Sequence, residues 1–390
     1  MFTKETVIGV IGSGAMGAGI AQVASAAGHP VVLYDTNEEA LRKSKVNLEI
    51  ALGKLVEKQK ITGEQAAGME ARITYVGDLA RFGNCGLVIE AIVENLDVKQ
   101  SVFKQLETIV APGCVLATNT SSLSIASIAA VCKESTRVVG IHFFNPAPVM
   151  PLVEIIPGIL TAESIADSCF SLISSWGKVC VRAKDTPGFI VNRVARSYYG
   201  ESIRISEEGI ADFATIDWAL KEFGGFKMGP FELMDFIGND VNFKVTESVW
   251  EQFFYEPRFK PSLTQKRLYE ARLFGRKSGR GYYVYGTTPE IPQPSKDPVL
   301  GKKVFQRVIA MLINEAIDSV YLKLASKEDI DLAMTKGVNY PNGLLKWGDE
   351  LGLSEILETL TELYETYGED RYRPCLLLKQ MVKQKQNFYR

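Results

Sequence analysis

The sequence is poor in histidine and cysteine, and it lacks long apolar runs. Only two His and six Cys occur in 390 residues. The Cys are scattered without CxxC spacing, which argues against a zinc site or a disulfide framework and favours a reducing, cytoplasmic compartment. No apolar run approaches the roughly 18 residues of a transmembrane helix. Because the first predicted strand begins within a few residues of Met1, we also expect no signal peptide.

An excess of charge of either sign is missing as well. The 44 basic residues nearly balance the 46 acidic ones. This leaves no basic field for nucleic acid and no polybasic strip for an anionic membrane, so we expect neither partner. At a prior of roughly 150 residues per domain, the length predicts two or three domains.

A glycine-rich loop stands between a predicted strand at 6–11 and a helix. It consists of Gly12, Ser13, Gly14, Ala15, Met16 and Gly17. This G-x-G-x-x-G spacing suits a tight turn, close approach of a pyrophosphate and packing of the helix on the strand. A second predicted strand, 30–34, ends in Asp35, near the spacing of the carboxylate that binds the adenine ribose. No Arg follows Asp35 directly, so the pattern favours NAD over NADP.

Polar residues follow two further predicted strands. Glu94 and Lys99 come after the strand at 87–92, and Asn119 and Ser121 come after the strand at 115–118. In an open α/β sheet, residues just past the carboxyl ends of the strands face the ligand crevice. The alternative for the serine is that it caps a helix that starts near Ser124.

One His and one Glu are predicted to lie side by side. The sequence from 137 to 156 reads as two strands joined by a proline-rich loop, which can pair His142 with Glu154. A His that donates from one ring nitrogen to a carboxylate becomes a better proton acceptor. The alternative is a satisfied core His beside a surface Glu. The other His, His29, lies in a Gly-His-Pro loop and is predicted to be exposed.

Two helical segments carry candidate ligand contacts. Residues 37–70 read as a charged hairpin whose lysines, Lys58 among them, are either solvated or meet a phosphate-bearing substrate. A predicted helix at 190–209 carries Asn192 in its first turn. This amide could orient a substrate oxygen or bond to the preceding linker.

A repeat occupies the last two hundred residues. Glu201 matches Glu315 and Gly229 matches Gly343 at an offset of 114, and Arg258 matches Arg371 at 113. The predicted domains are 1–186, then one helical copy at 187–286, a proline-rich linker at 287–299 and a second copy at 300–390. The second copy has Gln306 where the first has Asn192, so we expect it to be architectural.

Several motifs, in order, resemble the L-3-hydroxyacyl-CoA dehydrogenase family, which includes 3-hydroxybutyryl-CoA members. They lie at 12–17, 90–95, 119–123, 142–146, 185–193, 228–233 and 274–282. The resemblance implies a Rossmann-type α/β NAD-binding domain followed by two tandem all-α domains. It also implies reversible oxidation of (S)-3-hydroxyacyl-CoA to 3-ketoacyl-CoA with NAD, in fatty-acid β-oxidation or short-chain acyl-CoA metabolism.

The resemblance also implies roles for single residues. His142 would be the general base, Glu154 its partner, and Ser121 and Asn192 would bind the reacting oxygen. Lys58 would be the lysine that faces CoA. The NAD-binding residues would be Gly12, Gly14, Ala15, Met16, Gly17, Asp35, Glu94, Lys99 and Asn119. No metal is implied.

The second helical copy departs from the minimal family pattern. Relatives with one copy dimerise through it, so residues 300–390 would occupy the partner's place in a monomer or homodimer. Two alternatives remain at this point: an inactive NAD-binding or structural homologue, and a different β-hydroxyacid dehydrogenase. The latter class commonly uses Lys or Cys in the catalytic position, and the His142/Glu154 pair argues against it.

Overall fold

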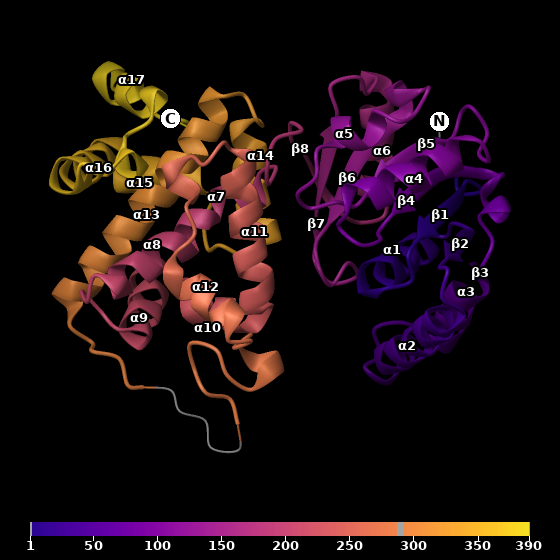
Figure 1. Ribbon diagram of the computed structural model, residues 1–390, viewed down its shortest axis with the longest axis horizontal. Helices are drawn as coiled ribbons and strands as arrows, with labels where there is room; N and C mark the ends of the chain where they lie inside the picture. Colours follow the sequence, from indigo (N-terminus) through magenta and orange to yellow (C-terminus); the bar gives the residue numbers. More distant parts are fainter. Residues whose placement is uncertain (1, 287–291, 390) are drawn as a thin grey trace. The chain divides into compact units, whose positions relative to one another are not determined.

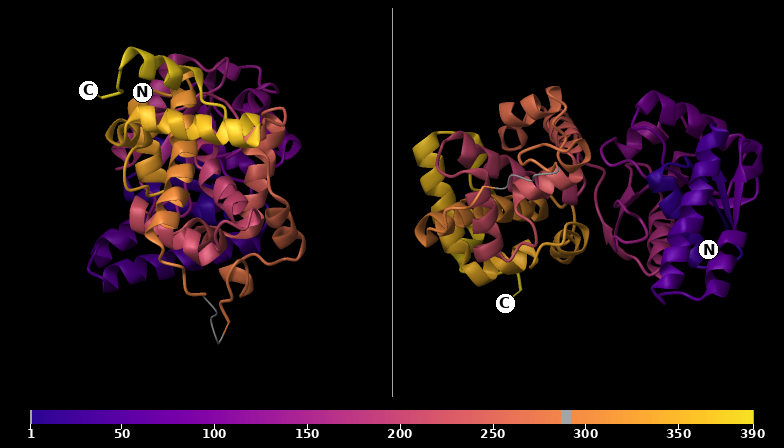
Figure 2. Two further views of the ribbon diagram at one scale, coloured as in Figure 1. Left: turned by 90° about the vertical axis from the view of Figure 1, so that its left-hand side faces the viewer. Right: turned by 90° about the horizontal axis from the view of Figure 1, so that it is seen from below.

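In the computed structural model, which describes residues 2–286 and 292–389, all the β-strands lie before residue 183. The chain forms two compact units, one ending at Thr186 and the other beginning at Pro187 (Figures 1 and 2). In the described part of the chain, no helix is both long and apolar enough to cross a membrane.

The first unit contains one eight-stranded sheet with the order β3-β2-β1-β4-β5-β6-β7-β8. Every neighbouring pair is parallel except β6 and β7, which are antiparallel. The strands are β1 Val7–Ile11, β2 Val31–Tyr34, β3 Ile73–Val76, β4 Cys85–Glu90, β5 Val115–Thr118, β6 Val138–Phe143, β7 Leu152–Pro157 and β8 Val179–Arg182. The order reverses between β2-β1 and β1-β4, which makes the switch point of a doubly wound sheet.

Helices cover the sheet because its strands are apolar on both faces. One set of strand side chains, such as Val10 and Leu33, shares a core with residues of α1, α2, α3 and α6. The alternate residues face the other way; a Cβ at Gly140 would meet Ile125 of α5. The helices are α1 Ala15–Ala26, α2 Glu38–Glu57, α3 Gly63–Ala71, α4 Leu96–Glu107, α5 Ile125–Ala129 and α6 Glu163–Ser175.

The second unit is helical, and its elements occur twice in the same order. The first series is α7 Val191–Val194, α8 Arg196–Glu207, α9 Phe213–Gly224, α10 Pro230–Ile237, α11 Asn239–Gln252, the 3₁₀ turn η3 Pro257–Phe259 and α12 Leu263–Glu270. The second is α13 Pro298–Tyr321, α14 Lys327–Gly337, α15 Leu344–Leu351, α16 Leu353–Tyr367, η5 Asp370–Tyr372 and α17 Leu376–Gln384. The predicted repeat therefore corresponds to two structural copies.

The two copies pack together within the second unit. Helix α13 packs against α8 and α9 of the first copy and against α15, α16 and α17 of its own (Figures 1 and 2). In each copy an Asp caps a helix: Asp217 accepts from the amides of Phe231 and Glu232 in α10, and Asp331 accepts from those of Leu345 and Lys346 in α15. The same contact, an Asp carboxylate that accepts from backbone amides at the start of a helix, therefore recurs at the offset seen in the sequence.

Three local predictions need correction. The helix predicted at 190–209 is two helices, because the amide of Tyr198 bonds to the carbonyl of Ala195 and interrupts the α-helical pattern. The linker predicted at 287–299 ends earlier, since α13 begins at Pro298; its residues 287–291 lie outside the described residues. His29 is buried, with its ring against Trp176 and its Nδ1 3.2 Å from the Thr6 carbonyl oxygen.

Candidate active site

The glycine-rich loop joins β1 to α1 at the switch point. Gly12 has φ +97°, and a Cβ there would lie 2.6 Å from the Ala91 carbonyl oxygen. A Cβ at Gly17 would lie 1.8 Å from the Gly12 carbonyl oxygen, so helix and loop pack at a distance that excludes a side chain. A Cβ at Gly14 would meet nothing, and no side chain caps the first turn of α1. This open helix N-terminus, flanked by Ala15 and Met16, fits a pyrophosphate.

Asp35 lies at the end of β2, beside the same loop. Its Oδ2 accepts hydrogen bonds of 2.8 Å from both the amide and the hydroxyl of Ser13, and its Oδ1 accepts from the Asn37 amide. Burial raises the pKa of Asp35, but the hydrogen bonds from Ser13, Asn37 and Thr36 outweigh it and hold the pKa below its usual value. The loop therefore carries an ionised carboxylate, which suits two ribose hydroxyls and opposes a 2′-phosphate.

Glu94 organises the polar residues beyond β4 and β5. Its Oε1 accepts hydrogen bonds from the Thr120 hydroxyl at 2.5 Å and from the Ser121 amide at 3.0 Å. Burial raises the pKa of Glu94, but the charge of Lys99 and these hydrogen bonds lower it overall. The Ser121 backbone is thus fixed by Glu94, and the helix after it is capped by Ser124 instead.

Lys99 lies behind Glu94 and is only 1% exposed. Its Nζ is 2.6 Å from Glu90 Oε1 and 3.2 Å from Glu94 Oε2. Glu90 also accepts from the Thr118 hydroxyl. This buried network positions Glu94, so Lys99 acts behind the site and offers almost no surface to a cofactor. The sequence analysis assigned no role to Glu90 or Thr120. The role of Glu90 could have been predicted, because it ends an apolar strand and a Lys follows nine residues later.

Asn119 follows β5 and bonds to the strands on both sides of it, β4 and β6. Its amide donates to the Glu90 carbonyl, and its side-chain oxygen accepts from the Phe143 amide at 2.8 Å. Because Phe143 follows His142, this bond fixes the end of β6 next to the histidine. The structure therefore gives Asn119 a positioning contact in addition to its place at the crevice.

His142 and Glu154 face each other across β6 and β7, as predicted. The antiparallel register pairs them, and Nδ1 of His142 lies 2.7 Å from Oε2 of Glu154. His142 is 6% exposed and Glu154 is fully buried, so the alternative with a surface Glu is wrong. With the carboxylate accepting from Nδ1–H, the imidazole carries its lone pair on Nε2. The pair stands at the edge where β1, β4 and β5 also end.

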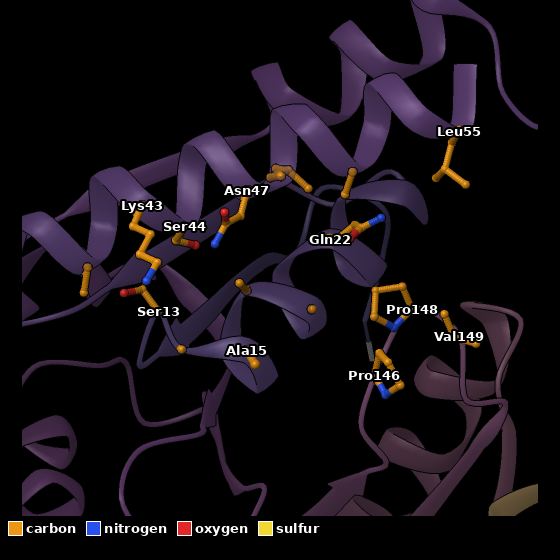
Figure 3. Close-up of a pocket in the computed structure, with 16 residues that line it drawn as sticks. Ser13, Ala15, Gln22, Lys43, Ser44, Asn47, Leu55, Pro146, Pro148 and Val149 are labelled. Carbon is orange, nitrogen blue, oxygen red and sulfur yellow. The ribbon is translucent and has the colours of Figure 1, made fainter. Parts of the chain in front are cut away.

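A pocket of about 680 Å³ opens beside the glycine-rich loop (Figure 3). Helix α2 lines one side with Lys43, Ser44, Asn47 and Leu55, and α1 contributes Gln22. The loop after β6 closes it with Pro146, Pro148 and Val149. The pocket is mostly apolar, yet the buried Ser44 hydroxyl has no hydrogen-bond partner among the described residues. An apolar pocket with a few polar groups is the usual form of a small-molecule site.

Two predicted contacts lie away from this group. Lys58 is exposed and caps α2, one turn beyond Leu55; the lysine that lines the pocket is Lys43. Asn192 lies in α7 of the second unit. The remaining predicted residues belong to the first unit and follow the carboxyl ends of its parallel strands or lie beside them. Among the described residues, no cluster of three or more potential ligands could hold a metal ion.

Family models match almost the whole chain. Residues 7–186 match the NAD-binding domain of 3-hydroxyacyl-CoA dehydrogenase, and residues 188–285 and 304–388 match the C-terminal domain of the same enzyme. The chain belongs to the 3-hydroxyacyl-CoA dehydrogenase family. It is accordingly an NAD-dependent oxidoreductase that acts on the CH–OH group of 3-hydroxyacyl-CoA. The two matches to one C-terminal model confirm the predicted repeat.

Individual relatives agree with this assignment. The chain is 40% identical to 3-hydroxyadipyl-CoA dehydrogenase of Escherichia coli, over 97% of this chain and 98% of that protein. It is 43% identical to human mitochondrial hydroxyacyl-coenzyme A dehydrogenase, over 71% of this chain and 90% of that protein. The solved structure of 3-hydroxybutyryl-CoA dehydrogenase from Escherichia coli is 38% identical, with a TM-score of 0.93 over 98% of this chain and 99% of that one.

Proposed function

We propose that His142 is the general base that takes the proton from the 3-hydroxyl group, and that Glu154 orients it and stabilises its cationic form. The buried 2.7 Å contact between the two side chains supports this proposal. A positioned base contributes about 10²–10⁴-fold to a rate. NAD, when bound, accepts the hydride from C3; the chain supplies orientation and the movement of the proton.

The other polar groups hold the reactants in place. Gly14, Ala15 and Met16 bind the pyrophosphate through the open first turn of α1, and Asp35 binds the adenine ribose. Glu94 receives the nicotinamide ribose and is positioned by Lys99. Ser121 and Asn192 donate hydrogen bonds to the reacting oxygen, which strengthen as negative charge develops on it.

We assign the pocket between α1 and α2 to part of the CoA moiety. It lies beside the loop that follows His142, and it combines apolar walls with Lys43, Ser44 and Asn47 (Figure 3). Lys58, one turn further along α2, would meet a phosphate that extends past the pocket. The six buried free thiols favour a reducing, cytoplasmic setting.

The deciding experiment follows NADH absorbance with acetoacetyl-CoA, beside a longer 3-ketoacyl-CoA and with NADPH as the control. We expect rapid, NADH-specific loss with at least one thioester. Tight NADH binding without turnover of either substrate would contradict the proposed catalytic roles.

We also propose that the second helical copy takes the place of a dimer partner. The ion pairs between the copies are reciprocal: Arg193 binds Glu315 at 2.5 Å, and the matching pair, Arg307 and Glu201, meets at 2.6 Å. Reciprocal contacts of this kind define a two-fold interface between like surfaces. Here one chain supplies both sides.

A chain truncated after Gly286 tests this idea. Without the second copy, Arg193 and Glu201 lose their buried partners. We therefore expect aggregation or self-association, with soluble yield and mass measured by light scattering. A stable, fully active monomer of the truncated chain would refute the proposal.

A further inference from the structure

A second cavity, of about 260 Å³, lies entirely within the helical unit. Its walls come from the last turn of α9, the first half of α13, the end of α15 and the first half of α16, and α13 packs against the other three helices (Figure 1). The volume is below the roughly 300–1,000 Å³ of pockets for drug-sized ligands, so it suits a smaller molecule. The functions assigned above use none of its lining residues.

The aromatic part of the wall is fixed by packing. The rings of Phe305 and Trp347 have centres 5.8 Å apart. Phe223 meets the Trp218 ring edge-on at 5.6 Å, and a Cβ at Gly301 would lie 2.5 Å from the Phe223 ring. Phe223 and Phe305 therefore form a preformed apolar surface, on which the hydrocarbon part of a ligand can pack.

Polar side chains of both charges line the same cavity. Lys302 and Gln306 lie four residues apart on α13, and Glu355 and Thr359 lie four apart on α16, so each pair shares one face of its helix. No described residue makes an ion pair with Lys302 or Glu355, and none bonds to the Gln306 side-chain amide. The Thr359 hydroxyl donates to the Glu355 carbonyl at 2.9 Å and keeps its acceptor sites. The cavity thus offers a cation and an anion, each with a neutral polar group beside it.

Comparison with the first copy shows that these charges are not a requirement of the fold. At the offset of 114, the matching residues of the first copy carry no charge and no hydroxyl. They are Gly188, Val241 and Val245, in place of Lys302, Glu355 and Thr359. Gln306 alone keeps an amide, because it matches Asn192. The second copy therefore has a polar group where the first has Asn192, but with charges around it that the first copy lacks, which indicates a different ligand.

Opposite charges beside an apolar wall select a ligand that carries both charges. A ligand with only a carboxylate would place its charge near Glu355, and a ligand with only an ammonium group would place its charge near Lys302. Like charges that face each other weaken binding and so exclude the wrong ligand. An α-amino acid holds both groups on one carbon atom and directs its side chain away from them. In a cavity of this size, the flexible Lys302 and Glu355 side chains can reach neighbouring atoms of one small molecule.

We propose that this cavity binds an α-amino acid with an apolar side chain, such as phenylalanine. Lys302 and the Gln306 amide donate to its carboxylate, and Glu355 and the Thr359 hydroxyl accept from its ammonium group. The aromatic wall packs on its side chain. The second copy is then a ligand-binding module in addition to its place beside the first copy. The inference does not depend on the proposed catalytic roles, because all the residues that carry it lie in the helical unit.

The test is isothermal titration calorimetry of the full chain with L-phenylalanine and three analogues. Phenylpropionate lacks the ammonium group, phenylethylamine lacks the carboxylate, and glycine lacks the apolar side chain. We expect L-phenylalanine to bind at least about 10-fold more tightly than each analogue. Phenylpropionate and phenylethylamine each lose hydrogen bonds to a charged group, and glycine loses the burial of its side chain.

Two variants assign the charged contacts. Lys302→Met should weaken the binding of L-phenylalanine by about 10-fold and leave that of phenylethylamine unchanged, because phenylethylamine has no carboxylate to lose a partner. Glu355→Gln should weaken L-phenylalanine similarly and leave phenylpropionate unchanged. The matched controls are Lys303→Met and Glu358→Gln, which remove exposed charges of the same two helices outside the cavity. Both controls should keep the wild-type affinity.

Three results would overturn the inference. They are no saturable binding of L-phenylalanine, phenylpropionate or phenylethylamine binding as tightly as the amino acid, and an affinity that survives both Lys302→Met and Glu355→Gln. Each of them would leave the NADH-dependent turnover of a 3-ketoacyl-CoA unaffected. Failure of this inference is therefore distinguishable from failure of the proposed function.

Discussion

Replacing Glu154 with Gln should abolish most of the turnover while leaving the fold and the cofactor site intact. Glu154 is fully buried, and its Oε2 is 2.7 Å from His142 Nδ1. Gln has almost the same volume, so the change removes a charge without making a cavity. The uncharged amide can also donate toward Nδ1, which would put the imidazole proton on Nε2, the atom that has to accept one.

The size of the effect follows from the loss of a correctly oriented base. A general base contributes about 10²–10⁴-fold, which corresponds to about 2.7–5.4 kcal/mol at 1.36 kcal/mol per tenfold. We therefore expect kcat to fall by at least about 100-fold in the oxidation of a 3-hydroxyacyl-CoA, followed by NADH formation. The NADH dissociation constant, measured by fluorescence titration, should stay within about threefold of the wild type, because the dinucleotide loop lies on β1 and α1.

Glu163→Gln is a suitable control for this experiment. Glu163 lies in the same unit, at the start of α6, and makes an exposed ion pair with Arg182. Exposed pairs contribute little, so its kcat and stability should be nearly unchanged. If Glu154→Gln kept a kcat within about tenfold of the wild type while folding normally, the assignment of His142 and Glu154 as the proton-transfer pair would be wrong.

Three further predictions concern the cofactor, the pocket and the interface between copies. Asp35→Asn should weaken NADH binding by about 10–100-fold, the contribution of a hydrogen bond to a charged group, and should reduce the preference for NADH over NADPH in the same titration. Lys43→Glu should raise KM for the acyl-CoA and leave the NADH dissociation constant unchanged in steady-state assays; an unchanged KM would place CoA elsewhere. Arg193→Met should lower the free energy of unfolding by about 3–5 kcal/mol in urea titrations, because it leaves Glu315 with one fewer buried cation. The matching Arg307→Met should have a similar effect through Glu201, and a small loss for both would mean that the reciprocal pairs do not hold the copies together.

Much of the first unit could be predicted because its signals are local. Predicting the glycine-rich loop requires only the spacing of Gly12, Gly14 and Gly17. Predicting the role of Asp35 requires only its distance in sequence from that loop, at the end of the second strand. The pairing of His142 with Glu154 was predictable because a single loop joins their strands, and antiparallel neighbours in sequence pair readily. The repeat was visible because it is a property of the sequence itself.

Other features depend on contacts between residues far apart in the chain. The network around Glu90 and Glu94 is completed by Thr118 and Thr120, which follow 28 and 26 residues later in the chain. His29 was expected to be exposed, and only the packing of Trp176 shows that it is buried. No pattern in the sequence predicted the pocket between α1 and α2, since its walls come from three separate segments.

The sequence by itself determined the family and the cofactor and predicted the pairing of His142 with Glu154, because these are encoded by residue types at fixed local spacings. Only the tertiary structure decided which charged residues have partners. It paired Arg193 with Glu315 and Arg307 with Glu201 across 122 and 106 residues of chain. Burial and counter-charge are properties of the assembled unit.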